Sequence, residues 1–137
     1  MKIVVSDDLA AAHALRRAVF IDEQGYTEDE EWDDLDGAAI LLLALDGDTP
    51  VGTARLFTDG DAGKIGRICV LKPHRGTGLG AALVAEGCRR LRDAGCRVVR
   101  LSAQTHALPF YERLGFTAHG AEYPDGAIPH RDMEKPL

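Results

Sequence analysis

The sequence predicts a mixed α/β or α+β fold, in which helices cover both faces of one sheet. Short apolar runs alternate along the chain with segments of helical periodicity. A glycine-rich turn links one of these runs to the longest amphipathic segment. The chain has 137 residues, of which 45% are hydrophobic and 28% charged, as is usual for one globular domain. We therefore expect a single domain that covers residues 1–137.

The first half of the chain predicts a strand, a helix and a hairpin. Residues 2–5 (KIVV) predict a short strand, and the polar residues 6–8 suit the start of a helix over residues 9–20. Apolar side chains recur along that helix at helical spacing, at Leu9, Ala12, Leu15 and Val19. Two apolar runs then flank residues 46–50 (DGDTP), whose Asp, Gly and Pro favour a turn. Residues 38–57 therefore predict a hairpin.

The second half predicts a central strand followed by helices and outer strands. Apolar residues fall on both faces of residues 63–71 (GKIGRICVL), so we expect both faces of this strand to be covered. Residues 78–95 predict a long amphipathic helix that ends at Gly95. The remaining elements are a strand over 96–103, a short helix over 106–115 and final strands over 116–123 and 128–136.

Charge and composition exclude several classes of protein. The net charge of −6 argues against nucleic acid as a partner, and no apolar run is long enough to span a bilayer. Cys69, Cys88 and Cys96 contain no CxxC pair and suit reduced thiols. The histidines lack the HExxH and zinc-finger spacings, so we expect no metal site. These features together predict a cytoplasmic protein with no membrane partner.

The stretch HRGTGLG, residues 74–80, carries the main functional signal. It places glycines at positions 76, 78 and 80, between the predicted central strand and the long helix. Backbone N–H groups in such a turn favour an anion, above all a phosphate, because they lie at the positive end of a helix dipole. The chain has no Gly-Lys-Ser/Thr of a P-loop, and GxGxG differs from the Rossmann GxGxxG. The third alternative is the pyrophosphate loop of acyl-CoA-dependent acetyltransferases.

Two motifs resemble the GCN5-related N-acetyltransferase (GNAT) superfamily. RGTGLG, residues 75–80, matches its (Gln/Arg)-x-x-Gly-x-(Gly/Ala) signature. QTHALPFYERLGF, residues 104–116, resembles its second signature, Asn-x-x-Ala-x-x-x-Tyr-x-x-x-Gly-Phe, with Gln104 where Asn is usual. With VFIDEQG (19–25) and AIPH (127–130), the chain is similar to the ElaA-like subgroup over nearly its whole length.

The resemblance implies a mostly antiparallel sheet of roughly six or seven strands with about four helices. It also implies that the strands at 63–71 and 96–103 splay apart to admit acetyl-CoA, the cosubstrate. The acetyl group would pass directly to an amine, without a covalent enzyme intermediate. Homodimers are common in the superfamily, so a homodimer is a further expectation.

The site residues follow from the matched motifs. The residues implied to bind the cofactor are Ile68, Cys69, Val70, Arg75, Gly76, Thr77, Gly78, Leu79, Gly80, Gln104 and Arg113. Tyr111 would be the general acid that protonates the leaving thiolate. The N–H of Val70, or that of a neighbouring residue, would stabilise the oxyanion of the thioester carbonyl.

Three residues compete for the role of general base. Many superfamily members place a carboxylate near the start of the central strand, where this chain has Gly66 and Arg67. Glu23, in the loop after the first helix, is the first candidate, and His106 and His130 are the alternatives because the ordinary pKa of His is near 6.5. Arg67 would then be free to face a carboxylate of the substrate. The missing carboxylate also motivates a second hypothesis, a non-catalytic acyl-CoA-binding sensor or interaction module.

An acidic segment near the first helix bears on the acceptor. Nine carboxylates lie between Asp22 and Asp36 with no Lys or Arg among them. They form either a solvated surface that keeps the protein soluble or a surface that attracts a cationic amine acceptor, whether a small molecule or a peptide. The anionic cofactor would then approach from elsewhere, near Arg89, Arg90 and Arg92.

Overall fold

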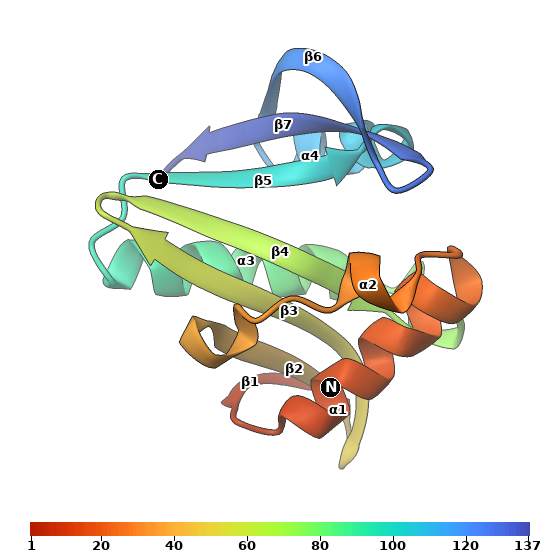
Figure 1. Ribbon diagram of the computed structural model, residues 1–137. Coiled ribbons are helices and arrows are strands. Elements are labelled where there is room, and N and C mark those ends of the chain that lie inside the picture. Colours follow the sequence, from red (N-terminus) through yellow and green to blue (C-terminus); the bar gives the residue numbers. More distant parts are fainter.

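The computed structural model describes residues 1–137, and its seven strands form one sheet with helices on both faces (Figure 1). The strands are β1 (Lys2–Ser6), β2 (Ile40–Asp46), β3 (Thr49–Asp59), β4 (Ala62–Val70), β5 (Val98–Gln104), β6 (Thr117–Asp125) and β7 (Ile128–Pro136). The α-helices are α1 (Leu9–Arg16), α2 (Glu28–Glu31), α3 (Leu79–Asp93) and α4 (Leu108–Arg113). A π-helical segment, η1 (Arg17–Glu23), continues α1, and three 3₁₀ turns are η2 (Asp36–Ala38), η3 (Lys72–His74) and η4 (Thr105–Ala107).

The sheet has the order β1-β2-β3-β4-β5-β7-β6. Every neighbouring pair is antiparallel except β4 with β5, which is parallel. The predicted mixed, mostly antiparallel sheet with four helices is confirmed. None of the helices is long and apolar enough to cross a membrane.

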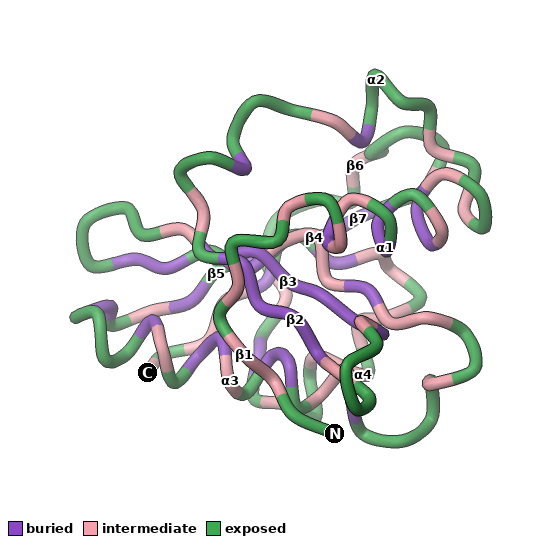
Figure 2. Tube along the Cα trace, turned by 90° about the horizontal axis from the view of Figure 1, so that it is seen from below, coloured by how far each residue is buried: buried purple, intermediate pink, exposed green.

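The helix α3 packs on one face of the sheet and forms the larger core. Leu83 and Leu91 have no exposed surface, and they pack with apolar residues of β3, β4 and β5. A Cβ atom at Gly87 would lie 2.9 Å from Ile65 Cδ1, so the close approach of α3 to β4 requires glycine at this position. Figure 2 shows that buried residues gather on β2, β3 and the inner side of α3.

The helix α1 and the segment η1 cover the opposite face with a smaller core. Leu15, Val19 and Phe20 are buried there together with Leu41 and Leu43 of β2. The apolar stripe predicted for residues 9–20 therefore faces the sheet. It anchors the first part of the acidic segment to β2.

The parallel strands β4 and β5 pair over only three residues, from Ala62 with Val98 to Lys64 with Arg100. Beyond Lys64 they diverge, as Figure 1 shows. A bulge adds to the irregularity of β4, because its register against β3 shifts near Arg67, whose φ is 49°. The divergence divides the molecule into a lower arm, β1–β4 with α1 and α2, and an upper arm, β5, β6 and β7 with α4. The predicted splay is therefore confirmed.

Candidate active site

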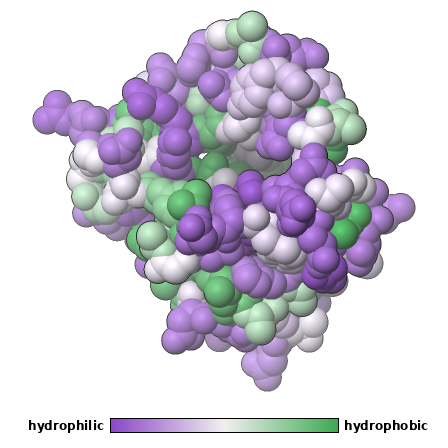
Figure 3. Space-filling model, in the orientation of Figure 1, coloured by the Kyte–Doolittle hydropathy of each residue, from purple (hydrophilic) through white to green (hydrophobic).

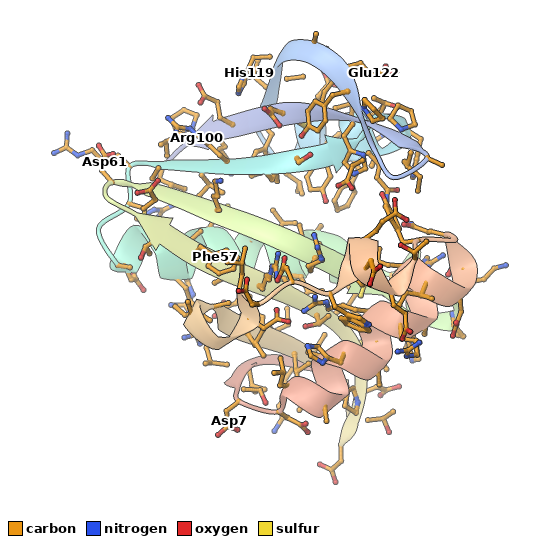
Figure 4. All side chains as sticks on the ribbon, viewed as in Figure 1. Asp7, Phe57, Asp61, Arg100, His119 and Glu122 are labelled. Carbon is orange, nitrogen blue, oxygen red and sulfur yellow. The ribbon has the colours of Figure 1, made fainter.

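A cleft of about 1210 Å³ opens between the two arms. Figure 3 shows it as a hollow with hydrophilic side chains around its opening. Phe57 of the lower arm and Arg100 of the upper arm lie where β4 and β5 are paired, and His119 lies farther along the upper arm (Figure 4). The predicted site residues that line the cleft are Glu23, Ile68, Cys69, Val70, Arg75, Gln104, His106, Tyr111 and His130.

The unpaired edge of β4 turns backbone groups toward this cleft. The Leu71 N–H donates to the Val51 carbonyl of β3 (2.9 Å). Because successive residues of a strand point their N–H groups to opposite edges, the N–H of Val70 faces the cleft. The Val70 carbonyl on the same edge accepts a hydrogen bond from Arg75 Nε (2.9 Å). At this edge the N–H of Val70 is therefore free to donate, whereas the carbonyl of Val70 is already bound by Arg75.

The three glycines at positions 76, 78 and 80 differ in their backbone conformation and surroundings. Gly76 and Gly78 have φ angles of 76° and 84°, in the left-handed region that favours glycine, and Gly78 caps the N-terminus of α3. Gly80 has ordinary helical backbone, and a Cβ atom there would make an ordinary contact with Phe110 at 3.5 Å. The shape of the turn thus requires two of the three glycines.

This turn leaves six successive backbone N–H groups, from Gly76 to Ala81, without acceptors in the protein. The Arg75 N–H donates to the Lys72 carbonyl (3.2 Å), and the Ala82 N–H donates to the Gly78 carbonyl (3.0 Å). The 15-residue helix α3 adds its positive dipole end. The expected anion cradle thus begins one residue later than Arg75, and it suits a diphosphate.

The side chain of Arg75 joins the end of β4 to η1. Its guanidinium holds Glu23 through two hydrogen bonds, Nη1 to Oε2 (2.6 Å) and Nη2 to Oε1 (2.7 Å). This pairing lowers the pKa of Glu23. A carboxylate held in this way accepts a proton less readily, so the arrangement suits Glu23 better for positioning Arg75 than for general-base chemistry.

Tyr111 lies at the start of the upper arm, on α4. Its ring packs edge-to-face on Phe110 and Phe116, with ring centroids 4.9 and 6.0 Å away. Burial raises the pKa of its hydroxyl to about 12, so the proton is retained at neutral pH. Burial likewise raises the pKa of the Cys69 thiol in the same cleft to about 12. Cys69 is therefore a poor nucleophile at neutral pH.

The two candidate histidines differ in their surroundings. His106 is exposed, and its Nε2 lies 2.7 Å from Gln104 Oε1, an acceptor, so Nε2 must carry the proton. His130 is only 5% exposed, and its Nδ1 donates to the Ile128 carbonyl (2.9 Å). In neutral His130 the lone pair is therefore on Nε2.

Arg113 stays exposed on α4 and makes no ion pair. Phe110, three residues earlier on the same helix, lies beside Gly80. A helix places residues three apart on neighbouring positions of one side. Arg113 therefore remains a candidate for contact with an anion at the start of α3.

The acidic segment folds back on arginines of the lower arm. Arg16, which is 1% exposed, binds Glu31 through Nε (2.8 Å) and Asp36 through Nη1 (2.7 Å). Arg55 holds Asp33 through two hydrogen bonds of 2.7 Å, which lower the pKa of Asp33 to about 2. Five of the nine carboxylates form ion pairs with arginine: Glu23, Glu28, Glu31, Asp33 and Asp36. The segment is therefore neither a wholly solvated surface nor a surface of free carboxylates that could attract a cationic acceptor.

Two further expectations concern arginines. Arg67 lines the cleft, but its guanidinium is not free for a substrate carboxylate, because it binds Glu31 Oε2 and the Glu31 carbonyl, each at 3.0 Å. Arg89 and Arg90 both pair with Glu86 on the exposed side of α3. They lie about 15 Å along the helix from its N-terminus, at 1.5 Å per residue, and so do not flank the glycine-rich turn.

Two sets of contacts were not predicted from the sequence: one joins the two arms, through Gln24, Gln104 and Tyr26, and the other lies within the upper arm, around Tyr123. Gln24 of the lower arm donates to and accepts from Gln104 of β5, with nitrogen–oxygen distances of 3.4 and 2.8 Å. Tyr26 packs against Gly126, where a Cβ atom would lie 2.7 Å from its ring. Tyr123 bonds to Ser102 and donates to Asp132 (2.6 Å). Only the alternation of β6 and β7 signalled that Tyr123 and Asp132 share a face.

The splayed β4–β5 pair and the glycine turn with unsatisfied N–H groups agree with the resemblance to N-acetyltransferases. The chain belongs to the acetyltransferase (GNAT) domain family, whose model matches residues 7–137. It is 36% identical to the uncharacterized N-acetyltransferase YjcF of Bacillus subtilis over 139 aligned residues, which cover 98% of this chain and 99% of YjcF.

Solved structures share the fold. Escherichia coli ElaA is 27% identical, has a TM-score of 0.82 and aligns over 98% of this chain and 97% of its own. An aminoglycoside 6'-N-acetyltransferase in complex with coenzyme A has a TM-score of 0.79 at 19% identity, with 99% of this chain and 97% of its own aligned. This second likeness concerns the fold alone.

Proposed function

We propose that this protein transfers an acetyl group from acetyl-CoA to a primary amine by direct attack in a ternary complex. The observation that carries the proposal is the combination of the splayed β4 edge with the six free N–H groups from Gly76 to Ala81. The edge of β4 would receive the pantetheine and thioester, and the six N–H groups would hold the diphosphate. Gly76, Thr77, Gly78, Leu79 and Gly80 would thus contact the cofactor through backbone atoms.

In this mechanism the thioester carbonyl lies against the N–H of Val70. That N–H stabilises the negative charge that develops on oxygen when the amine attacks. Ile68 and Cys69 supply the neighbouring backbone. The high pKa of the Cys69 thiol supports direct transfer, because an acyl-cysteine intermediate would need a thiolate.

Tyr111 is the proposed acid for the departing thiol of CoA. An ordinary thiol has a pKa of about 8.5, well below the value of about 12 for Tyr111. Because desolvation disfavours the charged thiolate, the pKa of a leaving thiol buried in the cleft would lie above its ordinary value and closer to that of Tyr111. A leaving thiol that is desolvated to a similar degree would match Tyr111 and accept its proton efficiently.

His130 is the proposed base, ahead of Glu23 and His106. A primary ammonium has a pKa of about 10.4, so its neutralisation at pH 7 costs about 4–5 kcal/mol. The Nδ1–H bond to the Ile128 carbonyl leaves Nε2 free to take the proton. Asp125 Oδ2, 3.8 Å from Nε2, would then stabilise the imidazolium.

The direct test is acetyl-CoA with a panel of primary amines, in which free CoA and the acetylated product are both quantified. We expect equal amounts of CoA and N-acetyl product, and no acetyl group on the protein when the acceptor is omitted. Tight CoA binding without product for any amine would favour the non-catalytic acyl-CoA-binding module. An acetylated protein that is competent to react with the amine would contradict direct attack.

Replacement of Gly78 by Val tests the diphosphate cradle. Valine strains a backbone with φ of 84° and redirects the N–H groups of the turn. We expect the CoA dissociation constant to rise at least tenfold, about 1.4 kcal/mol, measured by calorimetry well below the unfolding temperature. Gly60→Val is the matched control: it places the same side chain on a left-handed backbone, with φ of 61°, in the turn between β3 and β4, and it should change CoA affinity less than threefold. A folded Gly78→Val protein with unchanged CoA affinity would remove the turn from the site.

A further inference from the structure

Six side chains gather where the hairpin of β6 and β7 meets the segment after η1. They line the cleft from both arms and consist of two tyrosines, one histidine and three carboxylates: Tyr26, Glu30, Tyr123, Asp125, His130 and Asp132. The arms touch here, because a Cβ atom at Gly126 would lie 2.7 Å from the Tyr26 ring and 2.9 Å from Glu30 Oε2. We call this group the rim cluster.

The charged groups of the rim cluster are carboxylates, and the cluster contains no Lys or Arg. None of its three carboxylates forms an ion pair with Lys or Arg. The arginines that line the cleft are engaged elsewhere: Arg55 by Asp33 and Asp36, Arg67 by Glu31, Arg75 by Glu23, and Arg100 by Glu134. Lys64 is at the other end, where β4 and β5 are still paired. No Lys or Arg binds the rim cluster directly, and the nearby Arg67, whose charge reaches Tyr26, is itself held by Glu31.

The tyrosines of the rim cluster respond to its carboxylates. Burial and the charge of Asp125 raise the pKa of Tyr26 to about 12. Burial and the hydrogen bond to Asp132 also raise the pKa of Tyr123. Both tyrosines therefore stay neutral, and aromatic rings beside carboxylates are a combination that favours ammonium groups.

Two acceptor atoms of the rim cluster, His130 Nε2 and Asp125 Oδ2, suit a ligand with several N–H groups. His130 is 5% exposed, yet its Nε2 makes no hydrogen bond and lies 3.8 Å from Asp125 Oδ2. That separation is too long for a hydrogen bond between them. An amino group placed between the two atoms could donate to both.

A second acceptor for N–H groups lies two residues along the same strand. His130 and Asp132 face the same side of β7, and a strand rises about 3.3 Å per residue, so their Cα atoms are about 7 Å apart. Asp132 already accepts a hydrogen bond from Tyr123 (2.6 Å) and retains further acceptor capacity. The spacing matches the two nitrogens of a short aliphatic diamine.

We infer that the acceptor is a primary amine that carries a second cationic group, with its reacting nitrogen between His130 and Asp125 and its second ammonium on Asp132 beside Tyr123. The inference rests on the proposed acetyl transfer and narrows its substrate class. The inference places the binding of a cationic acceptor at the hairpin of β6 and β7, and not at residues 22–36, where most carboxylates are paired.

The test compares 1,4-diaminobutane with butylamine as acceptors at equal chain length. We expect wild-type kcat/KM to favour the diamine at least tenfold. Asp132→Asn, which keeps the shape of the side chain, should reduce this selectivity at least tenfold. Glu122→Gln is the matched control: Glu122 is exposed on β6 next to Tyr123, does not line the cleft and should leave the selectivity unchanged (Figure 4).

Diamine binding to the CoA-bound protein, measured by calorimetry, distinguishes failure of the diamine site from failure of the proposed acetyl transfer. Equal acetylation of both amines would overturn the diamine site and leave acetyl transfer intact. Diamine binding that depends on Asp132, without any acetylated product, would uphold the site and overturn the transfer. Equal losses of selectivity in Asp132→Asn and Glu122→Gln would show that only overall charge matters, which would also overturn the site.

Discussion

Replacement of Tyr111 by Phe is expected to lower kcat for acetyl transfer by 10- to 1000-fold, within the range typical of general-acid catalysis. The change removes only the hydroxyl and keeps the ring between Phe110 and Phe116. The affinity for acetyl-CoA and the unfolding temperature should stay close to those of the wild type. Single-turnover rates at saturating amine provide the measurement, because they report the chemical step.

The identity of the leaving group supplies the control for Tyr111. A thiolate that departs from a buried cleft needs a proton, whereas p-nitrophenolate departs as a stable anion at neutral pH. With p-nitrophenyl acetate as donor, the loss caused by Tyr111→Phe should therefore be much smaller than with acetyl-CoA. Equal losses with both donors would mean that the hydroxyl orients the substrate, and wild-type rates with acetyl-CoA would exclude it from the chemistry.

The sequence predicted the fold well because the decisive signals were local. Apolar spacing at residues 9–20 and 79–91 defined two helices, and DGDTP defined a hairpin. The glycines at 76 and 78 proved necessary for their left-handed backbone, which a turn between a strand and a helix readily requires. Each of these features depends on neighbours within a few residues, so one sequence was sufficient to recognise them.

The surroundings of the site were harder to predict because they depend on partners far apart in the chain. Arg16 and Glu31 are 15 residues apart, and Arg67 and Glu31 are 36 apart. Composition alone presented the acidic segment as nine free charges. One signal was available: Arg16 lies next to Leu15 on the face of α1 that packs on the sheet, so its charge had to meet a carboxylate.

Removal of the Glu31 carboxylate should therefore strongly destabilise the protein. Glu31 is 3% exposed and binds both Arg16 and Arg67. Glu31→Ala leaves the buried guanidinium of Arg16 with only part of its partners, and the loss of one member of a buried pair costs about 3–5 kcal/mol. Because Asp36 still binds Arg16 at 2.7 Å, we expect a loss of about 3 kcal/mol in the free energy of unfolding, measured by urea denaturation.

Glu28 provides the matched control on the same short helix. Its ion pair with Arg17 is exposed, at 62% for the Glu28 side chain, and exposed pairs contribute about 0–1 kcal/mol. Salt sharpens the comparison, since 1 M salt reduces the screening length to about 3 Å and should abolish the small effect of Glu28→Ala. The loss in Glu31→Ala should persist, because solvent ions cannot reach Arg16. Small, equally salt-sensitive losses in both variants would show that the acidic segment is a solvated surface after all, and that the buried arginines do not hold it against the sheet.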